Sequence, residues 1–216
     1  GTKKWRTCYV SDGTGHAMLF AVSDRAIAAG VPVHERKEAV ALIHDGSRCY
    51  GAVVRDLISG ELVAYVAKAT AIATGGAGRV YRPSTNAHAS TGDGMGMALA
   101  AGVPLKDMEF MQFHPTTMYP SGILITEGCR GEGGFLLNKD GERFMARYAP
   151  NALELASRDV VSRSEQTEID EGRGVNGSVL LDLRHLGAER ILERLPGSRE
   201  LAITYAGVDP IYDPIP

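Results

Sequence analysis

The sequence lacks the features that mark nucleic-acid binders and membrane proteins. Its 216 residues contain 23 Lys and Arg against 26 Asp and Glu, a formal net charge of −3. A basic excess, which nucleic-acid and membrane-surface binders normally show, is therefore missing. No run of about 18 uncharged apolar residues, the length of a membrane-spanning helix, is present. Residues 1–6 are polar and no small-residue cleavage pattern follows, so we expect no signal peptide.

Cysteine is also scarce. The chain has three cysteines, Cys8, Cys49 and Cys129, which are widely spaced and form no Cys-x-x-Cys pair. An odd number at these spacings predicts free thiols in a reducing compartment, and it provides no zinc site or other metal site.

The composition is that of a globular chain. Hydrophobic residues make up 44% of it, and the 26 glycines and 10 prolines together make up about a sixth, below the roughly 25–30% that marks low-complexity sequence. A chain of this length buries about 70% of its unfolded surface when it folds. The length allows one large domain or two small ones.

Hydrophobic periodicity and turn residues predict mixed secondary structure in the first half. Apolar residues at helical spacing between Met18 and Ile27, followed by Gly30, predict a helix over 14–29. Asp45-Gly46 is typical of a hairpin turn. The expected strands are 31–36, 38–44, 48–56, 61–68, 69–74 and 108–113, and a short helix is expected over 92–101.

The second half has a different pattern. Residues 122–134 are rich in glycine, and 138–141 has the composition of a hairpin turn. The expected elements are a helix over 155–171, a strand over 179–183, and helices over 186–195 and 199–205. The change of pattern predicts a domain boundary near 115–122, between an α/β part and an α+β part.

Glycines follow an apolar segment at Thr74-Gly75-Gly76-Ala77-Gly78. Glycines at the carboxyl end of a strand let the backbone approach a nucleotide cofactor, although the full Gly-x-Gly-x-x-Gly pattern is absent. A plain tight turn is the alternative. In the next helix, Asp93 is either a helix cap or an acceptor for a ribose or ribityl hydroxyl.

Four further side chains are suited to chemistry. His114 precedes a proline, which fixes an extended backbone, and it is either structural or functional. Glu127 and Arg130 lie in the glycine-rich loop, where they form either a surface ion pair or, with backbone N–H groups, an anion site that could hold phosphate. Arg158 lies early in the helix expected over 155–171, where the helix dipole disfavours a cation.

Eight segments, in this order and covering nearly the whole chain, together resemble the flavoprotein subunit of succinate dehydrogenase and fumarate reductase. Each segment is weak evidence by itself, and the ordered set is specific. The segments are RTCY at 6–9, TGH at 14–16, ATGGAG at 73–78, TGDG at 91–94, MEFMQFHPT at 108–116, TEGCRGEGG at 126–134, GERFM at 141–145 and LASRDVVSR at 155–163.

The resemblance implies a fold and an activity. Members of the family bind FAD in a glutathione-reductase-like α/β domain, carry a smaller α+β capping domain, and interconvert succinate and fumarate. Residues 1–116 would then be part of the FAD-binding domain, with its β-meander and flavin-contact segments. Residues 117–216 would be most of the capping domain that closes over the substrate.

The resemblance also implies roles for particular residues. Arg158 matches the proton donor to the substrate double bond, and Glu127 and Arg130 match the pair that returns the proton to it. His114 and Thr126 match residues that hydrogen-bond a substrate carboxylate. Because a closed, dry site is needed for an arginine to act as an acid, these side chains should converge although they are far apart in sequence.

On the cofactor side, Gly75 and Gly76 match glycines near the flavin, Asp93 matches a contact to its ribityl–phosphate region, and Asn86 is expected beside Asp93. The resemblance further implies an iron–sulfur subunit and a membrane quinone-binding cytochrome subunit as partners. It places the protein peripherally on the cytoplasmic side of the inner membrane.

The sequence departs from the family in several places. The amino-terminal Gly-x-Gly-x-x-Gly unit, the histidine that carries covalent FAD and the downstream His and Arg of the substrate clamp are not in the chain. Thr117 stands where many relatives have glycine. We therefore expect a middle piece of a longer protein that neither binds FAD tightly nor turns over by itself.

Two alternatives remain at this point. L-Aspartate oxidase shares the fold and similar His-Pro-Thr and Arg-Gly-Glu-Gly segments, and competition by aspartate rather than malonate would identify it. A non-catalytic FAD-fold or capping module is the other alternative, and flavin absorbance of the purified chain would test it.

Overall fold

The computed structural model describes residues 7–82 and 84–216; residues 1–6, with Arg6 of the first matched segment, and residue 83 lie outside the described part. The chain forms two compact units. The core unit combines the described residues up to Asp24 with Gln112–Pro216, and the sheet unit is Arg25–Met111. The assignment of 1–116 to a flavin-binding domain and 117–216 to a capping domain stays a prediction.

Helix α1 (Thr14–Ala28) confirms the first expected helix. Its carboxyl end is closed by Gly30, which has a φ of 68°. The amide of Gly30 donates to the carbonyl of Ile27 and that of Val31 to the carbonyl of Ala26. These bonds satisfy carbonyls that the last helical turn leaves free, and only glycine adopts this backbone conformation without strain.

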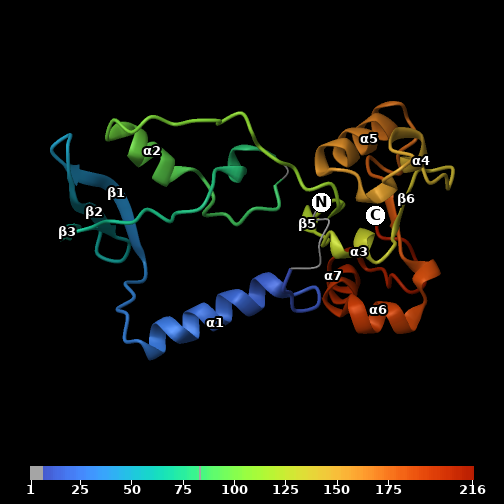
Figure 1. Cartoon of the computed structure of the whole chain (residues 1–216), viewed down its shortest axis with the longest axis horizontal. Coiled ribbons are helices and arrows are strands. Elements are labelled where there is room, and N and C mark those ends of the chain that lie inside the picture. Colours follow the sequence, from blue (N-terminus) through green and yellow to red (C-terminus); the bar gives the residue numbers. More distant parts are fainter. Residues whose placement is uncertain (1–6, 83) are drawn as a thin grey trace. The chain divides into compact units, whose positions relative to one another are not determined.

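The sheet unit is built on an antiparallel meander of β1 (Lys37–His44), β2 (Cys49–Asp56) and β3 (Leu62–Val66), in that order (Figure 1). Ala52 of β2 pairs with Leu42 on one side and Tyr65 on the other. The predicted hairpin turn is confirmed: the Asp45 carboxylate accepts the amides of Ser47 and Arg48. Such a local bond favours the turn over continued strand.

Three predicted strands, 31–36, 69–74 and 108–113, are wrong, because none of these segments is a strand in the structure. A strand needs a neighbouring strand to bind its backbone N–H and C=O groups, and none in the described part pairs with them. In the last segment, Phe110 donates instead to the nearby carbonyl of Asp107. Apolar composition alone could not supply the missing partner strand.

Helix α2 (Asp93–Ala100) confirms the short helix expected after the glycine turn, and a 3₁₀ turn, η1, covers Gly78–Val80. Gly94 packs so closely that a Cβ there would lie 1.8 Å from Oγ1 of Thr74. The amide of Gly92 also donates to the carbonyl of Gly76 over 3.2 Å. The glycine loop and the start of α2 are therefore held together.

Besides the part of α1 up to Asp24, the described residues of the core unit form short strands and five further helices. Strand β4 (Thr117–Met118) pairs with β5 (Ile123–Leu124), and β6 (Phe135–Leu137) pairs with β7 (Leu180–Asp182). The helices are α3 (Gly128–Gly131), α4 (Met145–Tyr148), α5 (Arg158–Asp170), α6 (Ala188–Arg194) and α7 (Pro196–Ala206), with 3₁₀ turns η2 (Leu153–Leu155) and η3 (Arg184–Leu186). The predicted strand 179–183 and the last three predicted helices are confirmed.

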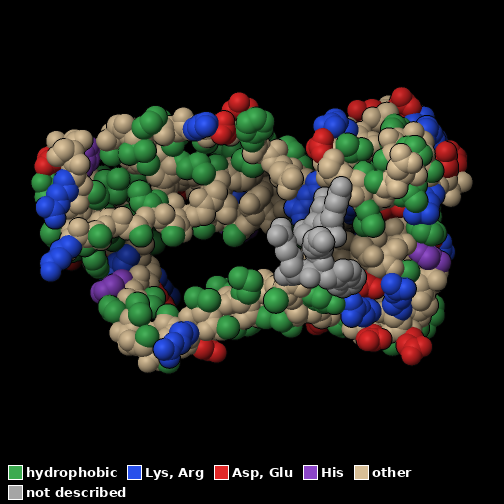
Figure 2. Space-filling model, viewed as in Figure 1, with side chains coloured by type: hydrophobic (Ala, Val, Ile, Leu, Met, Phe, Trp, Pro, Cys, Tyr) green, Lys and Arg blue, Asp and Glu red, His purple; other side chains and the backbone are tan. Residues whose placement is uncertain are grey.

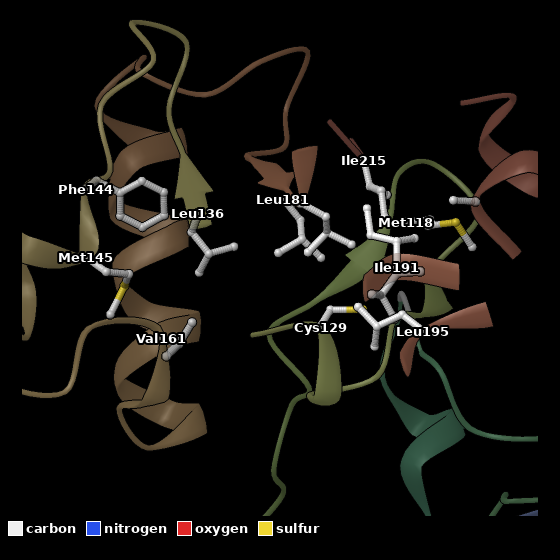
Figure 3. Packing of buried hydrophobic residues seen from close by; sticks show 13 residues of the cluster. Met118, Cys129, Leu136, Phe144, Met145, Val161, Leu181, Ile191, Leu195 and Ile215 are labelled. Atoms are coloured by element: carbon white, nitrogen blue, oxygen red, sulfur yellow. The ribbon is translucent and has the colours of Figure 1, made fainter. Parts of the chain in front are cut away.

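The buried apolar side chains of this unit pack into one cluster between residues 118 and 215 (Figure 3). Phe144, Val161 and Ile191 are fully buried within it. The backbone joins its distant parts: the amide of Leu181 donates to the carbonyl of Ile215 over 2.8 Å. This core fixes the ends of α3 and α5, which carry the candidate catalytic side chains.

The three cysteines are free, as predicted. Cys129 is fully buried in the cluster, and burial raises the pKa of its thiol to about 11. Within residues 7–82 and 84–216, none of the helices combines the length and apolar character that a bilayer-spanning helix requires.

Candidate active site

The most direct feature of the candidate site is an ion pair between α5 and the residue before α3. Arg158, the first residue of α5, donates from Nε and Nη2 to Oε2 of Glu127, over 3.0 and 2.7 Å. Its third nitrogen, Nη1, donates to Oε1 of Gln112 over 3.2 Å. The side chains of Arg158 and Glu127 are 37% and 43% exposed. The pair is thus open to solvent on one side.

Glu127 lies between two guanidinium groups. Its Oε1 is 3.7 Å from Nη2 of Arg130, while its Oε2 accepts from Arg158. Partial burial opposes ionisation of the carboxyl, but the hydrogen bonds and charge of Arg158, with the charge of Arg130, outweigh it and lower the pKa of Glu127. The carboxylate is therefore ionised at neutral pH and in contact with both arginines, which is the convergence that we predicted.

Arg130 is an unusual arginine because it is 1% exposed. Its Nη1 donates to the backbone carbonyl of Glu154 over 2.5 Å, whereas Nε and Nη2 have no hydrogen-bond partner. Burial lowers the pKa of Arg130, and the charge of Glu127 opposes this effect. A buried guanidinium with free N–H groups loses a proton more readily than a solvated one.

His114 and Thr126 both precede Glu127 in the chain, and the charges of Arg158, Arg130 and Glu127 act on the His114 ring. Nδ1 of His114 is 3.0 Å from the carbonyl oxygen of Thr116, so the ring is held by its own loop. Burial lowers the pKa of His114, and the positive charge of Arg158 acts in the same direction. Thr126 accepts the Gly128 amide through Oγ1. That both residues hold a substrate carboxylate stays a prediction.

The predicted cofactor residues lie in the sheet unit. Gly75 has a φ of 75°, and a Cβ on Gly75 or Gly76 would meet no atom within 4 Å. The Asp93 carboxylate, at the start of α2, is exposed and accepts a hydrogen bond from Oγ1 of Thr91 over 2.6 Å. The open space beside Gly75 and Gly76 would let a ligand approach the backbone closely, and the Asp93 carboxylate could accept hydrogen bonds from ligand hydroxyl groups. FAD is a ligand with these properties.

Asn86 lies against the loop that precedes α2, and its place beside Asp93 stays a prediction. Its side chain packs against Gly78, where an added Cβ would lie 2.2 Å from Nδ2, and it donates to Oγ of Ser84. Its contribution to a flavin site therefore stays a prediction.

Sequence reasoning missed three polar residues that contact or surround the arginines: Gln112, Glu154 and Glu165. Gln112 lies in a matched segment and received no role. Glu154 is 2% exposed and pairs with Arg143. Glu165 could have been found by helical periodicity, since it lies seven residues after Arg158 and so on the same side of α5.

The whole chain, residues 1–216, matches the family model described as FAD binding domain. The chain therefore belongs to this family of FAD-binding proteins, which confirms the resemblance and FAD as the cofactor.

Individual relatives agree with this assignment. The chain is 52% identical over 215 residues to the fumarate reductase flavoprotein subunit of Helicobacter pylori, covering 97% of the chain and 30% of the relative. It is 50% identical over 219 residues to the succinate dehydrogenase flavoprotein subunit of Rickettsia felis, covering 100% and 37%. The chain thus spans about a third of the length of these curated relatives.

A solved structure of E. coli quinol fumarate reductase is also similar. It matches with a TM-score of 0.92 and 43% identity, over 100% of this chain and 40% of that one. The backbone of the chain is therefore similar to part of that structure, and its mixture of helices and sheets is consistent with an α/β class.

Proposed function

We propose that the chain is part of the flavoprotein subunit of an enzyme that interconverts succinate and fumarate. The observation that carries the proposal is the Glu127 carboxylate, held by Arg158 at 2.7 Å and 3.7 Å from Arg130. In this proposal, residues 1–116 belong to the FAD-binding domain and 117–216 to the capping domain. The chain alone is then inactive, since two thirds of its relatives' length lies outside it.

The proton step falls to Arg158. When bound, FAD supplies hydride exchange at one of the two central carbons of the dicarboxylate. In fumarate reduction, a guanidinium N–H of Arg158 donates its proton to the other carbon, and the electron pair of the double bond forms the new C–H bond. Succinate oxidation runs the same transfer in reverse, with the neutral guanidine of Arg158 as the base.

An arginine can act as an acid only if its neutral form is transient. A solvated guanidinium has a pKa above about 12, so the proton must be replaced at once. Because Glu127 is ionised, it can take a proton from Arg130 and pass it to Arg158, to which it is hydrogen-bonded, so the proton moves from Arg130 through Glu127 to Arg158. The lowered pKa of the buried Arg130 supports this direction of transfer.

Substrate and cofactor contacts complete the proposal. His114 and Thr126 hold a substrate carboxylate, which fixes the reacting carbon toward Arg158. Gly75, Gly76 and Asp93, with Asn86 nearby, hold the flavin. The similarity to flavoprotein subunits supports an iron–sulfur subunit and a membrane quinone-binding cytochrome subunit as partners, with the protein peripheral on the cytoplasmic side of the inner membrane.

The test is Arg158→Lys in the full-length flavoprotein. Lysine keeps the charge but lacks the planar group that binds Glu127 through two nitrogens. Because positioned proton transfer contributes about 10²–10⁴-fold, turnover of fumarate should fall by at least that factor, and substrate affinity should fall less.

Arg163→Lys is the matched control. Arg163 lies on the same helix, is 71% exposed and pairs only with Asp159 among the ion pairs of the described residues. Its replacement should leave turnover unchanged. Near-normal fumarate reduction by Arg158→Lys would remove Arg158 from the proton step and with it the proposed function of this site.

A further inference from the structure

Helix α5 carries a buried carboxyl that the proposed proton step does not use. Glu165 is 7% exposed, and its Oε1 has no hydrogen-bond partner. Burial raises the pKa of Glu165 to about 8, and the charge of Arg130 opposes this rise. Buried polar atoms are almost always paired in folded proteins, so an unpaired carboxyl oxygen requires an explanation.

The charged group that acts on Glu165 is Arg130, which is also buried. Nε and Nη2 of Arg130 have no hydrogen-bond partner, and Nη2 lies 3.7 Å from Oε1 of Glu127. Arg130 in turn is influenced by Glu127, Glu165, Arg158 and Glu154. Besides its hydrogen bond to the backbone carbonyl of Glu154, Arg130 is therefore acted on by two further carboxyls: Glu127, which is partly exposed, and Glu165, which is buried.

We propose that Glu165 is a positioning residue that controls the proton relay through Arg130. When Glu165 is ionised, it attracts the Arg130 guanidinium and competes with Glu127 for it. When Glu165 is neutral, the Arg130 guanidinium interacts with the Glu127 carboxylate without this competition. This inference rests on the proposed function of Arg158, Glu127 and Arg130.

The charge balance gives the direction of the effect. With Glu165 neutral, the two arginines and Glu127 carry one net positive charge, which favours proton donation and a dicarboxylate. With Glu165 ionised, the same set is neutral, and Arg130 holds its proton more tightly. Turnover in fumarate reduction should therefore decrease as Glu165 loses its proton.

The experiment compares wild type, Glu165→Gln and Glu165→Asp in the full-length flavoprotein with FAD. The kcat and KM for fumarate are measured between about pH 6 and pH 10, where a pH profile reports the ionisation of groups in the enzyme–substrate complex. In wild type, kcat should fall up to tenfold per pH unit above about pH 8. Glu165→Gln should lose this fall with KM nearly unchanged, and Glu165→Asp should restore it at a shifted pH.

A second readout does not depend on activity. The infrared band of a protonated carboxyl should disappear as the pH rises through about 8 in wild type and should be absent from Glu165→Gln. Glu171→Gln, which removes an exposed carboxylate at the end of the same helix, is the matched control and should retain the wild-type profile.

Several results would overturn the inference. An unchanged kcat profile in Glu165→Gln would show that Glu165 does not act on the relay. If Glu165→Gln loses the same fraction of activity at every pH, Glu165 is a structural residue. The same conclusion follows if Glu165→Gln misfolds and the wild type shows no change of the carboxyl infrared band near pH 8. If Arg158→Lys is inactive while Glu165→Gln keeps the wild-type profile, the proposed function survives and only this inference fails.

Discussion

The core unit and the sheet unit differ in what holds them together. In the core unit, residues such as Phe144, Val161 and Ile191 form a continuous buried cluster. In the described part of the sheet unit, Val54 is the one large apolar side chain that is buried. Ile58, Val66 and Phe110 are all at least 75% exposed, and Figure 2 shows hydrophobic side chains spread over the surface of α2 and the three-stranded sheet.

This difference shows that two parts of one chain can be stabilised by different interactions. The core unit gains free energy by removing apolar surface from water. The sheet unit is held mainly by backbone pairing and local turns, and it leaves apolar surface of the kind that binds other protein segments or ligands. Substitutions should therefore have different effects in the two units.

The largest expected effect is in the apolar core. Ile191→Ala should lower the free energy of unfolding by about 2–5 kcal/mol, because the fully buried side chain leaves a cavity. Ile58→Ala is the same substitution at a side chain that is 75% exposed, and it should change stability by less than about 0.5 kcal/mol. Urea denaturation of the full chain, followed by circular dichroism, measures both. Equal losses would contradict the difference between the units.

The next effect concerns buried charge. Glu168 is fully buried, and its carboxylate accepts two bonds from Arg173, one from Tyr148 and one from Asn138. The bonds from Arg173, against the effect of burial, lower the pKa of Glu168 to about 2. The resulting stability is present above the ordinary glutamate pKa and is lost as the pH falls toward 2.

Glu168→Gln should therefore cost about 3 kcal/mol at neutral pH, and the difference from wild type should shrink in acid. The control in the sheet unit is Glu38→Gln, which breaks an ion pair with Arg55 whose side chains are about half exposed. That change should cost at most about 1 kcal/mol. Thermal unfolding measured across pH tests both, and a pH-independent loss in Glu168→Gln would reject the ionic explanation.

The smallest effect should come from the backbone of the sheet unit. Gly51 of β2 has a φ of 144°, and a Cβ there would lie 1.9 Å from the carbonyl oxygen of Tyr65 on β3. Gly51→Ala should therefore cost roughly 1–3 kcal/mol. Gly96→Ala, in α2 with open space around the α-carbon, should instead stabilise the chain by about 0.5–1 kcal/mol. Faster hydrogen exchange of the β2 and β3 amides would detect the destabilisation by Gly51→Ala. A change of stability with the same sign in both variants would contradict this prediction.

The sequence predicted the elements whose signals are local. Helix α1 and its terminal Gly30, the Asp45-Gly46 hairpin and the start of α2 all depend on residues within a few positions of one another, so periodicity and turn composition were sufficient. Segments 31–36 and 69–74 were predicted as strands from their composition, and both are exposed in the structure. A strand also requires a neighbouring strand as its hydrogen-bond partner. That partner is a tertiary contact, which local composition does not contain.

The candidate site divides in the same way. The ordered motifs of the sequence by themselves determined the family, the cofactor and the identity of Arg158, Glu127 and Arg130 as candidate residues. The tertiary structure decided that Arg158 and Glu127 meet across 31 residues, and that Arg130 and Glu165 are buried with unpaired polar atoms. Burial and long-range contact set the charge state of these groups, and both arise only when α3 and α5 pack onto the same core.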